Sequence, residues 1–368
     1  MTAVTLHSQP WETSKTDLVV RTVALSIVAV ALAFLVNNYL IFWRGWPGIV
    51  NLFSHLGWFG HEPLQTPLTG QALTLGWLQL IGYVALIVLI AFYVLITRDR
   101  PLRIDSAWLS GFASYIIRAA FWAVLLIGFV DSILSFLHVE GFLVYVAGDE
   151  LGKQLAQSRF RGTYVHYPLI LVSLVIAYFV RTLGFTWLAL LVVLAEFQIV
   201  IVRFIFSYEQ AFLGDLVRFW YAALFLFASA YTLREEAHVR VDVLYTGFSP
   251  RGKARTNAIG SLVLGIPLCW TILVVGMWGK ATIINAPLLV FETTQSGFGL
   301  YVKYLMASFL AVYALSMLVQ FTSYFLSNVA DLRGEPGRPH AESGAGLPGS
   351  DDIRSEMADH QPTTFIKQ

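Results

Sequence analysis

The stretch EEAHVRVDVLY, residues 235–245, places ionisable side chains between two long apolar runs. Valines alternate there with His238, Arg240 and Asp242. An alternation of period two is typical of an extended, half-buried segment that packs one face and leaves the other polar. On this interpretation, we expect the valines to contact neighbouring helices and the charges to have fixed partners. The other interpretation is a solvated helix cap, in which the same charges face water.

Charged side chains inside apolar runs form a second group that could do chemistry. An ionisable group at mid-bilayer costs about 2.5–3.5 kcal/mol on insertion scales, so such groups usually have partners or functions. For Glu196 three interpretations stay open: an internal ion pair, a contact with a partner subunit, or a ligand for a transported ion or proton. The charges in question are Arg118, Asp131, Glu196, Arg203 and Arg218.

Depth along the apolar runs predicts which of these charges pair. If the runs that carry them cross in the same direction, Arg118 and Glu196 differ in depth by about 6 Å, and Asp131 and Arg203 by about 3 Å. Arg118 and Asp131 lie about 20 Å apart along one helix and do not pair with each other. We therefore predict that the two runs are neighbours, joined by Arg118–Glu196 and Asp131–Arg203 ion pairs.

Several common chemistries lack their motifs in this sequence. It contains neither a Gly-x-x-x-x-Gly-Lys-Ser/Thr phosphate loop nor a His-Glu-x-x-His zinc motif. A single cysteine, Cys269, excludes an internal disulfide and a cysteine-based metal cage. Only His166 approaches an apolar run, which argues against a haem held between helices. We predict no enzymatic activity, cofactor or metal, and the net charge of +1 gives no reason to expect nucleic acid.

The elements that must position these residues are membrane helices. Only 13% of the 368 residues are charged and the mean hydropathy is +0.67, whereas soluble domains carry about 25% charged residues. A span needs about 20 apolar residues. The sequence thus predicts an all-α integral membrane protein, in contact with membrane lipid, with about eight transmembrane helices. The apolar runs lie near 22–42, 71–96, 109–137, 163–180, 183–207, 212–233, 256–279 and 304–330.

Basic residues in the short loops predict the orientation of these spans. The basic loop at 251–255 places the N-terminus and the C-terminus in the cytoplasm. The first run is too long for a signal-peptide core, so we interpret it as a retained anchor. Lys153, Arg159 and Arg161 then fall in an outer segment, against the rule. The fourth run is short, and His166 and Pro168 lie near its start.

Composition divides the chain into three parts. We predict an N-terminal extension with up to four transmembrane helices over 1–180, a four-helix domain over 181–331, and a disordered cytoplasmic tail over 332–368. The tail is rich in Gly, Pro, Ser, His and acids and cannot bury a core. Within the extension, we expect a short interfacial helix near 47–59 and a helical stretch over 149–159 in the outer segments.

The region of about 181–334 resembles the small membrane subunit, or Q-type subunit, of tripartite ATP-independent periplasmic (TRAP) transporters. The similarity rests on an acid before the second family helix (Glu209) and a Trp-containing helix (Trp220). It also includes Ala-Ser-Ala-Tyr at 228–231, His-Val-Arg-Val-Asp at 238–242 and Ser-Pro-Arg at 249–251. Within that family the region is most similar to the mannitol/chloroaromatic branch. Residues 1–180 depart from the usual four-helix subunit.

The resemblance implies a scaffold that clasps a large transport subunit in the bacterial inner membrane. A periplasmic binding protein would deliver an organic acid, a sodium gradient would drive its uptake, and the substrate and sodium sites would lie in the large subunit. The stretch 235–245 would then be the inner turn between the second and third family helices. The residues that we single out for subunit contacts or structural roles are Glu209, Arg218, Trp220, His238, Arg240, Asp242, Glu196, Arg118, Asp131 and Arg203.

A competing class is a self-contained secondary transporter or channel. Eight helices suffice for one, with Glu196, Arg118 and Asp131 lining a path. Against it, no run carries the paired Gly/Pro interruptions expected of a midplane substrate site. A third class, a membrane enzyme, has no positive support in the sequence.

Overall fold

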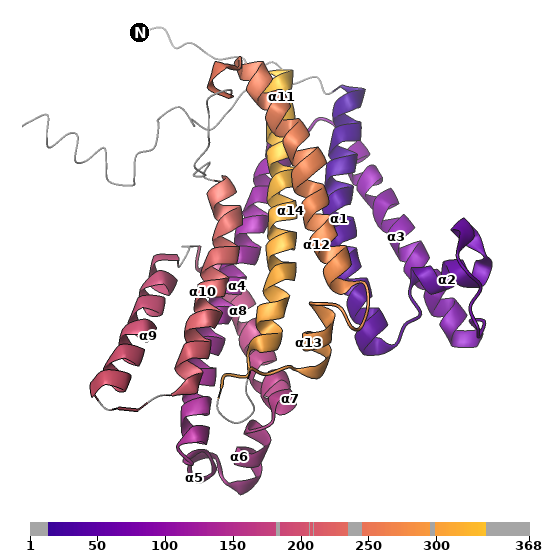
Figure 1. Cartoon of the computed structure of the whole chain (residues 1–368). Coiled ribbons are helices and arrows are strands. Elements are labelled where there is room, and N and C mark those ends of the chain that lie inside the picture. Colours follow the sequence, from indigo (N-terminus) through magenta and orange to yellow (C-terminus); the bar gives the residue numbers. More distant parts are fainter. Residues whose placement is uncertain are drawn as a thin grey trace, which may run out of the picture.

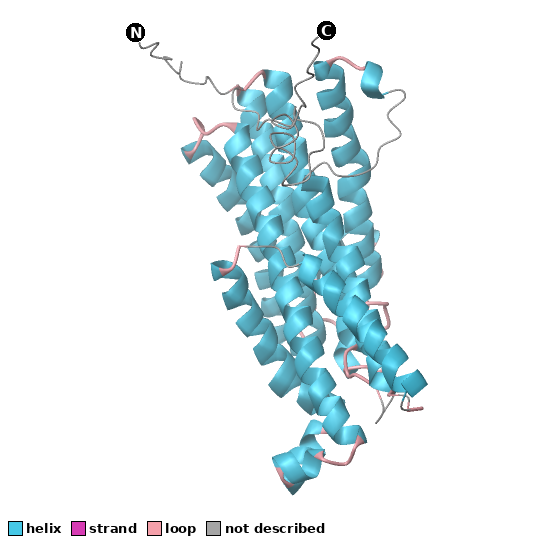
Figure 2. Ribbon diagram, turned by 90° about the vertical axis from the view of Figure 1, so that its left-hand side faces the viewer, coloured by secondary structure: helices cyan, strands magenta, loops and turns pink. Residues whose placement is uncertain are grey.

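A computed structural model of the chain describes residues 14–181, 185–205, 207–208, 210–234, 245–294 and 299–335. Helices joined by turns make up this part of the chain, and no strand occurs in it (Figure 2). The helices are α1 (Lys15–Arg44), α2 (Ile49–Leu56), η1 (Trp58–Gly60), α3 (Gly70–Ile96), α4 (Leu102–Val139), α5 (Leu143–Ala147), α6 (Asp149–Leu155), α7 (Ser158–Arg161), η2 (Gly162–His166), α8 (Tyr167–Phe179), α9 (Phe185–Ile205), α10 (Ala211–Arg234), η3 (Tyr245–Gly247), α11 (Pro250–Gly260), η4 (Ser261–Gly265), α12 (Ile266–Met277), α13 (Asn285–Val290) and α14 (Lys303–Arg333).

Eight helical stretches in the described part of the chain are long and apolar enough to cross a membrane. The expectation of an all-α multi-pass membrane protein is therefore confirmed. The short fourth run is part of a continuous 22-residue stretch, Ser158–Phe179, because the π-helical turn η2 joins α7 to α8 without a break. Pro168 lies two residues after the π-helical turn and has no backbone N–H to donate to the preceding turn, so the turn falls where the α-helical hydrogen bonding is interrupted. The short helices α2 and α6 match the helical stretches expected near 47–59 and 149–159.

Both described ends of the chain lie at the same end of the bundle (Figure 1). Arg333, in the last turn of α14, forms an ion pair of 3.0 Å with Asp17 of α1 and a hydrogen bond with Thr16. We call this the terminal end, and we call the opposite end, which carries α5, α6 and α13, the loop end. An even number of spans returns the chain to the side where it began. The assignment of the terminal end to the cytoplasm stays a prediction.

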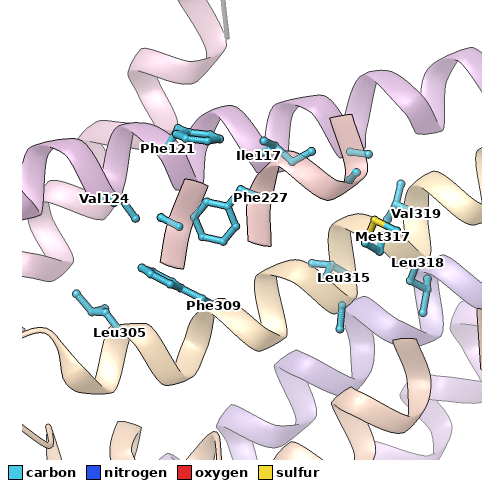
Figure 3. Packing of buried hydrophobic residues seen from close by; sticks show 14 of the residues in the cluster. Ile117, Phe121, Val124, Phe227, Leu305, Phe309, Leu315, Met317, Leu318 and Val319 are labelled. Carbon is cyan, nitrogen blue, oxygen red and sulfur yellow. The ribbon is translucent and has the colours of Figure 1, made fainter. Parts of the chain in front are cut away.

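The helix α14 lies at the centre of the bundle, with α4, α10, α12, α11 and α1 packed along it (Figure 1). In an apolar stretch of 18 residues of α14, 61% of the stretch is buried, whereas the corresponding share is 11% in α3 and in α9. Edge-to-face rings of Phe121, Phe227 and Phe309 join α4, α10 and α14 in the core (Figure 3). The helix α4 therefore belongs to the same hydrophobic core as α10 and α14, and packing crosses the sequence boundary predicted at 180.

Two hydrophobic helices lie at the periphery. The helix α3 packs against α1 and α2, and α9 packs against α10. Polar contacts hold α3 in place, since Gln79 accepts from the backbone N–H of Gly48 (3.0 Å) and donates to Asn37 (2.5 Å). The remaining faces of α3 and α9 are rich in exposed apolar side chains. These faces are suited to lipid or to another membrane subunit.

Candidate functional site

Four of the predicted site residues lie outside the described part of the chain. They are Glu209, His238, Arg240 and Asp242. The interpretation of 235–245 as a packed inner turn with fixed charge partners therefore stays a prediction. The helix α10 ends at Arg234, directly before this stretch, and the short helix η3 begins directly after it at Tyr245.

Asp131 of α4 is fully buried at the centre of an ion-pair cluster near the loop end. Its Oδ1 lies 3.0 Å from Nη1 of Arg161 and 3.1 Å from Nε2 of His166. Its Oδ2 accepts a hydrogen bond of 2.8 Å from the backbone N–H of Tyr301. The carboxylate thus joins α4 to the α7–η2 segment and to the residues before α14.

The other members of this cluster form further contacts, although Nη2 of Arg161 has no hydrogen-bond partner in the described part of the chain. Arg161 has no solvent-exposed side-chain surface; it donates to the Leu155 carbonyl and to Ser135, and its guanidinium lies 4.0 Å from the centre of the Tyr301 ring. His166 Nδ1 lies 2.8 Å from the Tyr304 hydroxyl. A buried charge is tolerated only when it is paired and hydrogen-bonded. We call Asp131, Arg161, His166 and Tyr304 the loop-end cluster.

The predicted ion pairs Arg118–Glu196 and Asp131–Arg203 are wrong. Asp131 pairs with Arg161 and His166, and Arg118 donates to the Ala177 carbonyl at 3.4 Å. The third and fifth spans do not pack along one another, because α4 contacts α8, α10 and α14 whereas α9 contacts α10. The position of a residue along its helix predicts how deep its charge lies in the membrane. It does not predict which neighbouring helix the side chain faces. Glu196 and Arg203 are exposed on α9.

The loop-end cluster also accounts for a basic residue that contradicted the orientation rule. Arg161 falls in the predicted outer segment, but its charge is buried against Asp131. A buried, neutralised arginine is not a loop charge of the kind that sets topology. The remaining exceptions are Lys153 and Arg159.

Asp215, in the first turns of α10, is a buried acid that the sequence analysis did not single out. It accepts a hydrogen bond of 3.2 Å from the backbone N–H of Leu300 and lies 3.3 Å from Arg218, whose side chain is exposed. Asp215 and Asp131 therefore hold consecutive backbone N–H groups before α14 from two different helices. The sequence feature that could have pointed to Asp215 is an acid at the start of an apolar helix.

Trp220 of α10 is buried against α4, as its assignment to a structural role requires. Its indole N–H donates to the Val124 carbonyl at 3.3 Å. A Cβ at Gly128 would lie 2.3 Å from that indole nitrogen, so only glycine permits this approach of the two helices. Trp220 of α10 and Gly128 of α4 therefore pack closely against each other.

A second set of ion pairs lies at the terminal end of the bundle. Buried Arg21 of α1 donates to Asp105 of α4 at 2.6 Å, and Arg100 lies 3.2 Å from the same carboxylate. Arg103 of α4 pairs at 2.6 Å with Asp331 of α14. These contacts join α1, α4 and α14. None of these pairs was predicted from the sequence, and the partners in Arg21–Asp105 and Arg103–Asp331 lie far apart along the chain.

The bundle defines a multi-pass helical membrane protein whose buried ion pairs join its helices. Residues 190–329 match the family model described as "Tripartite ATP-independent periplasmic transporters, DctQ component". The match covers α9 to most of α14 and less than half of the chain. No curated protein and no solved structure matches the chain. We call residues 190–329 the DctQ-type segment; its partners across the bundle, α1 to α8, lie outside the match.

Proposed function

We propose that this protein is the small permease subunit of a TRAP transporter and acts as a scaffold for the large transport subunit. The observation that carries the proposal is the DctQ-type segment itself, with its four spans α9, α10, α11–α12 and α14. The motifs at 228–231, 238–242 and 249–251 lie within that segment and support the same assignment. On this proposal, the protein lies in the bacterial inner membrane.

The proposal extends to the partners and to the energy source. The resemblance to TRAP small subunits implies that a periplasmic binding protein delivers an organic acid and that the sodium gradient drives its uptake. The substrate and sodium sites would belong to the large subunit. The described part of this chain offers buried charges that are already paired and an apolar cavity, which suits a supporting role.

The residues 1–180 would form an N-terminal extension that enlarges the scaffold. They supply α4, which covers α10 and α14, and they supply three members of the loop-end cluster. The DctQ-type segment would therefore depend on the extension for its packing. The exposed faces of α9 and of the extension would be available to the large subunit.

A self-contained transporter is the competing function, and the geometry gives it no specific support. Its proposed path residues lie apart: Asp131 is buried in an ion-pair cluster, Glu196 faces outward from α9, and Arg118 contacts the end of α8. None of the three lines the apolar cavity between α4, α8, α10 and α14.

Co-purification tests the scaffold assignment. The chain, with an affinity tag at its C-terminus, is expressed together with the large membrane subunit of the same TRAP transporter and is extracted in a mild detergent. We expect a stable complex of the two chains. Recovery of the tagged chain alone, at full yield and under conditions that preserve other membrane complexes, would contradict the proposal.

A further inference from the structure

Arg118, Arg181 and Arg234 converge where two spans end. Arg181 follows α8, and Arg234 is the last residue of α10. Arg118 of α4 donates to the carbonyl of Ala177, four residues before Arg181. Arg234 donates to Ser114, one turn before Arg118 on the same helix, at 2.8 Å. The positive charges of Arg181 and Arg234 accordingly act on Arg118.

Two arginines of this cluster, Arg118 and Arg181, place positive charge near each other. Neither Arg118 nor Arg181 forms an ion pair in the described part of the chain, and the Arg181 side chain is exposed. Like charges this close repel one another and favour a bound anion. Guanidinium groups bind phosphate through paired hydrogen bonds. Span ends are also where lipid headgroups lie.

An apolar cavity of about 250 Å³ reaches the same level of the bundle. It lies between α4, α8, α10 and α14 and follows α4 from Tyr115 to Ile127, about 18 Å at helical rise. Arg118 lies one residue before Ala119, which lines the cavity. The hydroxyls of Ser173 and Ser308, also in the lining, are bonded to carbonyls of their own helices. Part of its lining appears in Figure 3, around Val124, Phe227 and Phe309.

The size and lining of the cavity indicate what kind of molecule occupies it. Pockets that enclose a whole small molecule measure about 300–1,000 Å³ and place several polar groups against it. This cavity is smaller and offers almost no free polar group. It suits part of a hydrocarbon chain whose polar end lies outside, at the level of the arginines.

We propose that the arginine cluster and the cavity together bind one anionic phospholipid. The phosphate lies against Arg118 and Arg181, and one acyl chain occupies the cavity between α4, α8, α10 and α14. The site joins helices of the extension to helices of the DctQ-type segment. It does not depend on the transport function proposed above, because the binding is measured on this chain alone.

Lipid retention by the purified full-length chain tests the headgroup half of the proposal. The protein is incubated in detergent with equal amounts of phosphatidylglycerol and phosphatidylcholine, and retained lipid is counted by native mass spectrometry. We expect wild type to retain more phosphatidylglycerol than phosphatidylcholine. In the variant Arg118→Gln/Arg181→Gln, the ratio of the two retained lipids should fall at least five-fold. The single variant Arg181→Gln should lose part of the preference for phosphatidylglycerol. Because the Arg181 side chain is exposed, this loss does not come from a change in folding. The control Arg203→Gln, at the far end of α9, should behave as wild type.

Further arms separate the alternatives. Inorganic phosphate should not raise the unfolding temperature, whereas phosphatidylglycerol should; stabilisation by phosphate alone would overturn the lipid assignment. Ala123→Phe fills the cavity and should reduce lipid retention with the arginines intact, whereas Ala107→Phe on an exposed face of α4 should not. Unchanged retention in Ala123→Phe would overturn the acyl-chain half. Equal retention of phosphatidylglycerol and phosphatidylcholine by wild type would overturn the headgroup half.

Discussion

At the scale of single residues, Asp131 joins three segments of the chain. It neutralises a fully buried arginine, accepts from His166 and holds the backbone before α14. Its removal would leave Arg161 as an uncompensated charge in a buried site. Paired buried charges contribute little net stability, but breaking one such pair costs much more.

We predict that Asp131→Asn lowers the free energy of unfolding by about 3–5 kcal/mol, the usual cost of breaking a buried pair. The measurement is thermal or denaturant unfolding of the full chain in detergent. The double variant Asp131→Asn/Arg161→Met should recover part of the loss, because it removes both charges. Asp99→Asn, at an exposed ion pair, is the matched control and should change little. Equal stability of Asp131→Asn and wild type would show that the cluster is not structural.

The close approach of α4 and α10 at Gly128 makes a second residue-scale prediction. Gly128→Ala places a methyl group against the Trp220 indole and should cost about 1–3 kcal/mol through overpacking. Gly111→Ala, on the same helix with open space around it, should be neutral or slightly stabilising. Both are read from unfolding midpoints. A harmless Gly128→Ala would mean that the two helices do not pack as closely as described.

At the scale of elements, α9 carries an exposed charge in the middle of an apolar span. Glu196 is the twelfth residue of α9, about 17 Å from its start, and its helix packs against α10. An unpaired acid at that depth is costly in lipid, so on the proposed function it faces a partner subunit. Arg203, in the last turn, is near enough to the span end to reach the headgroups.

Glu196→Gln should therefore reduce recovery of the large subunit several-fold and leave the unfolding temperature of the isolated chain unchanged. Arg203→Gln is the control, with recovery near that of wild type. Both readouts come from the same tagged preparations, by pull-down and by thermal denaturation. Recovery that is equal for Glu196→Gln and wild type would assign this face of α9 to lipid.

The helices were predictable from sequence and their contacts were not. Length and hydropathy locate each span because the bilayer sets both, and even the stretch Ser158–Phe179, with its π-helical turn, is long and apolar enough to cross a membrane. The partner of Asp131 was missed because Arg161 precedes the fourth apolar run and looked like a loop residue. The contact between Trp220 and Gly128 could not be predicted without the arrangement of the helices. In a uniformly apolar run, the sequence does not show which side of the helix packs against a neighbour.

At the scale of the whole molecule, the extension and the DctQ-type segment form one bundle. The helix α4 packs against α10 and α14 along the core, the loop-end cluster ties it to the start of α14, and Arg103–Asp331 ties it to the end of α14. Residues from both halves share one hydrophobic core. The extension is therefore part of the fold that presents the DctQ-type segment.

A chain of residues 181–368 alone should consequently fail to give a stable protein. Without α4, the buried faces of α10 and α14 become exposed, and Tyr301 and Tyr304 lose the partners that Asp131 and His166 provide. Co-expression of residues 1–180 as a separate chain should restore a detergent-stable bundle. The measurement is monodispersity on size-exclusion chromatography. A monodisperse 181–368 fragment would show that the segment folds without the extension.

Reconstitution in vesicles tests the proposed scaffold function most directly. Vesicles with an inward sodium gradient receive the chain alone, the large subunit alone, or both, and the periplasmic binding protein loaded with its labelled organic acid is added outside. We predict uptake only when both membrane chains are present, and its loss when the gradient is collapsed. Uptake by this chain alone, at the rate of the complete system, would contradict the account.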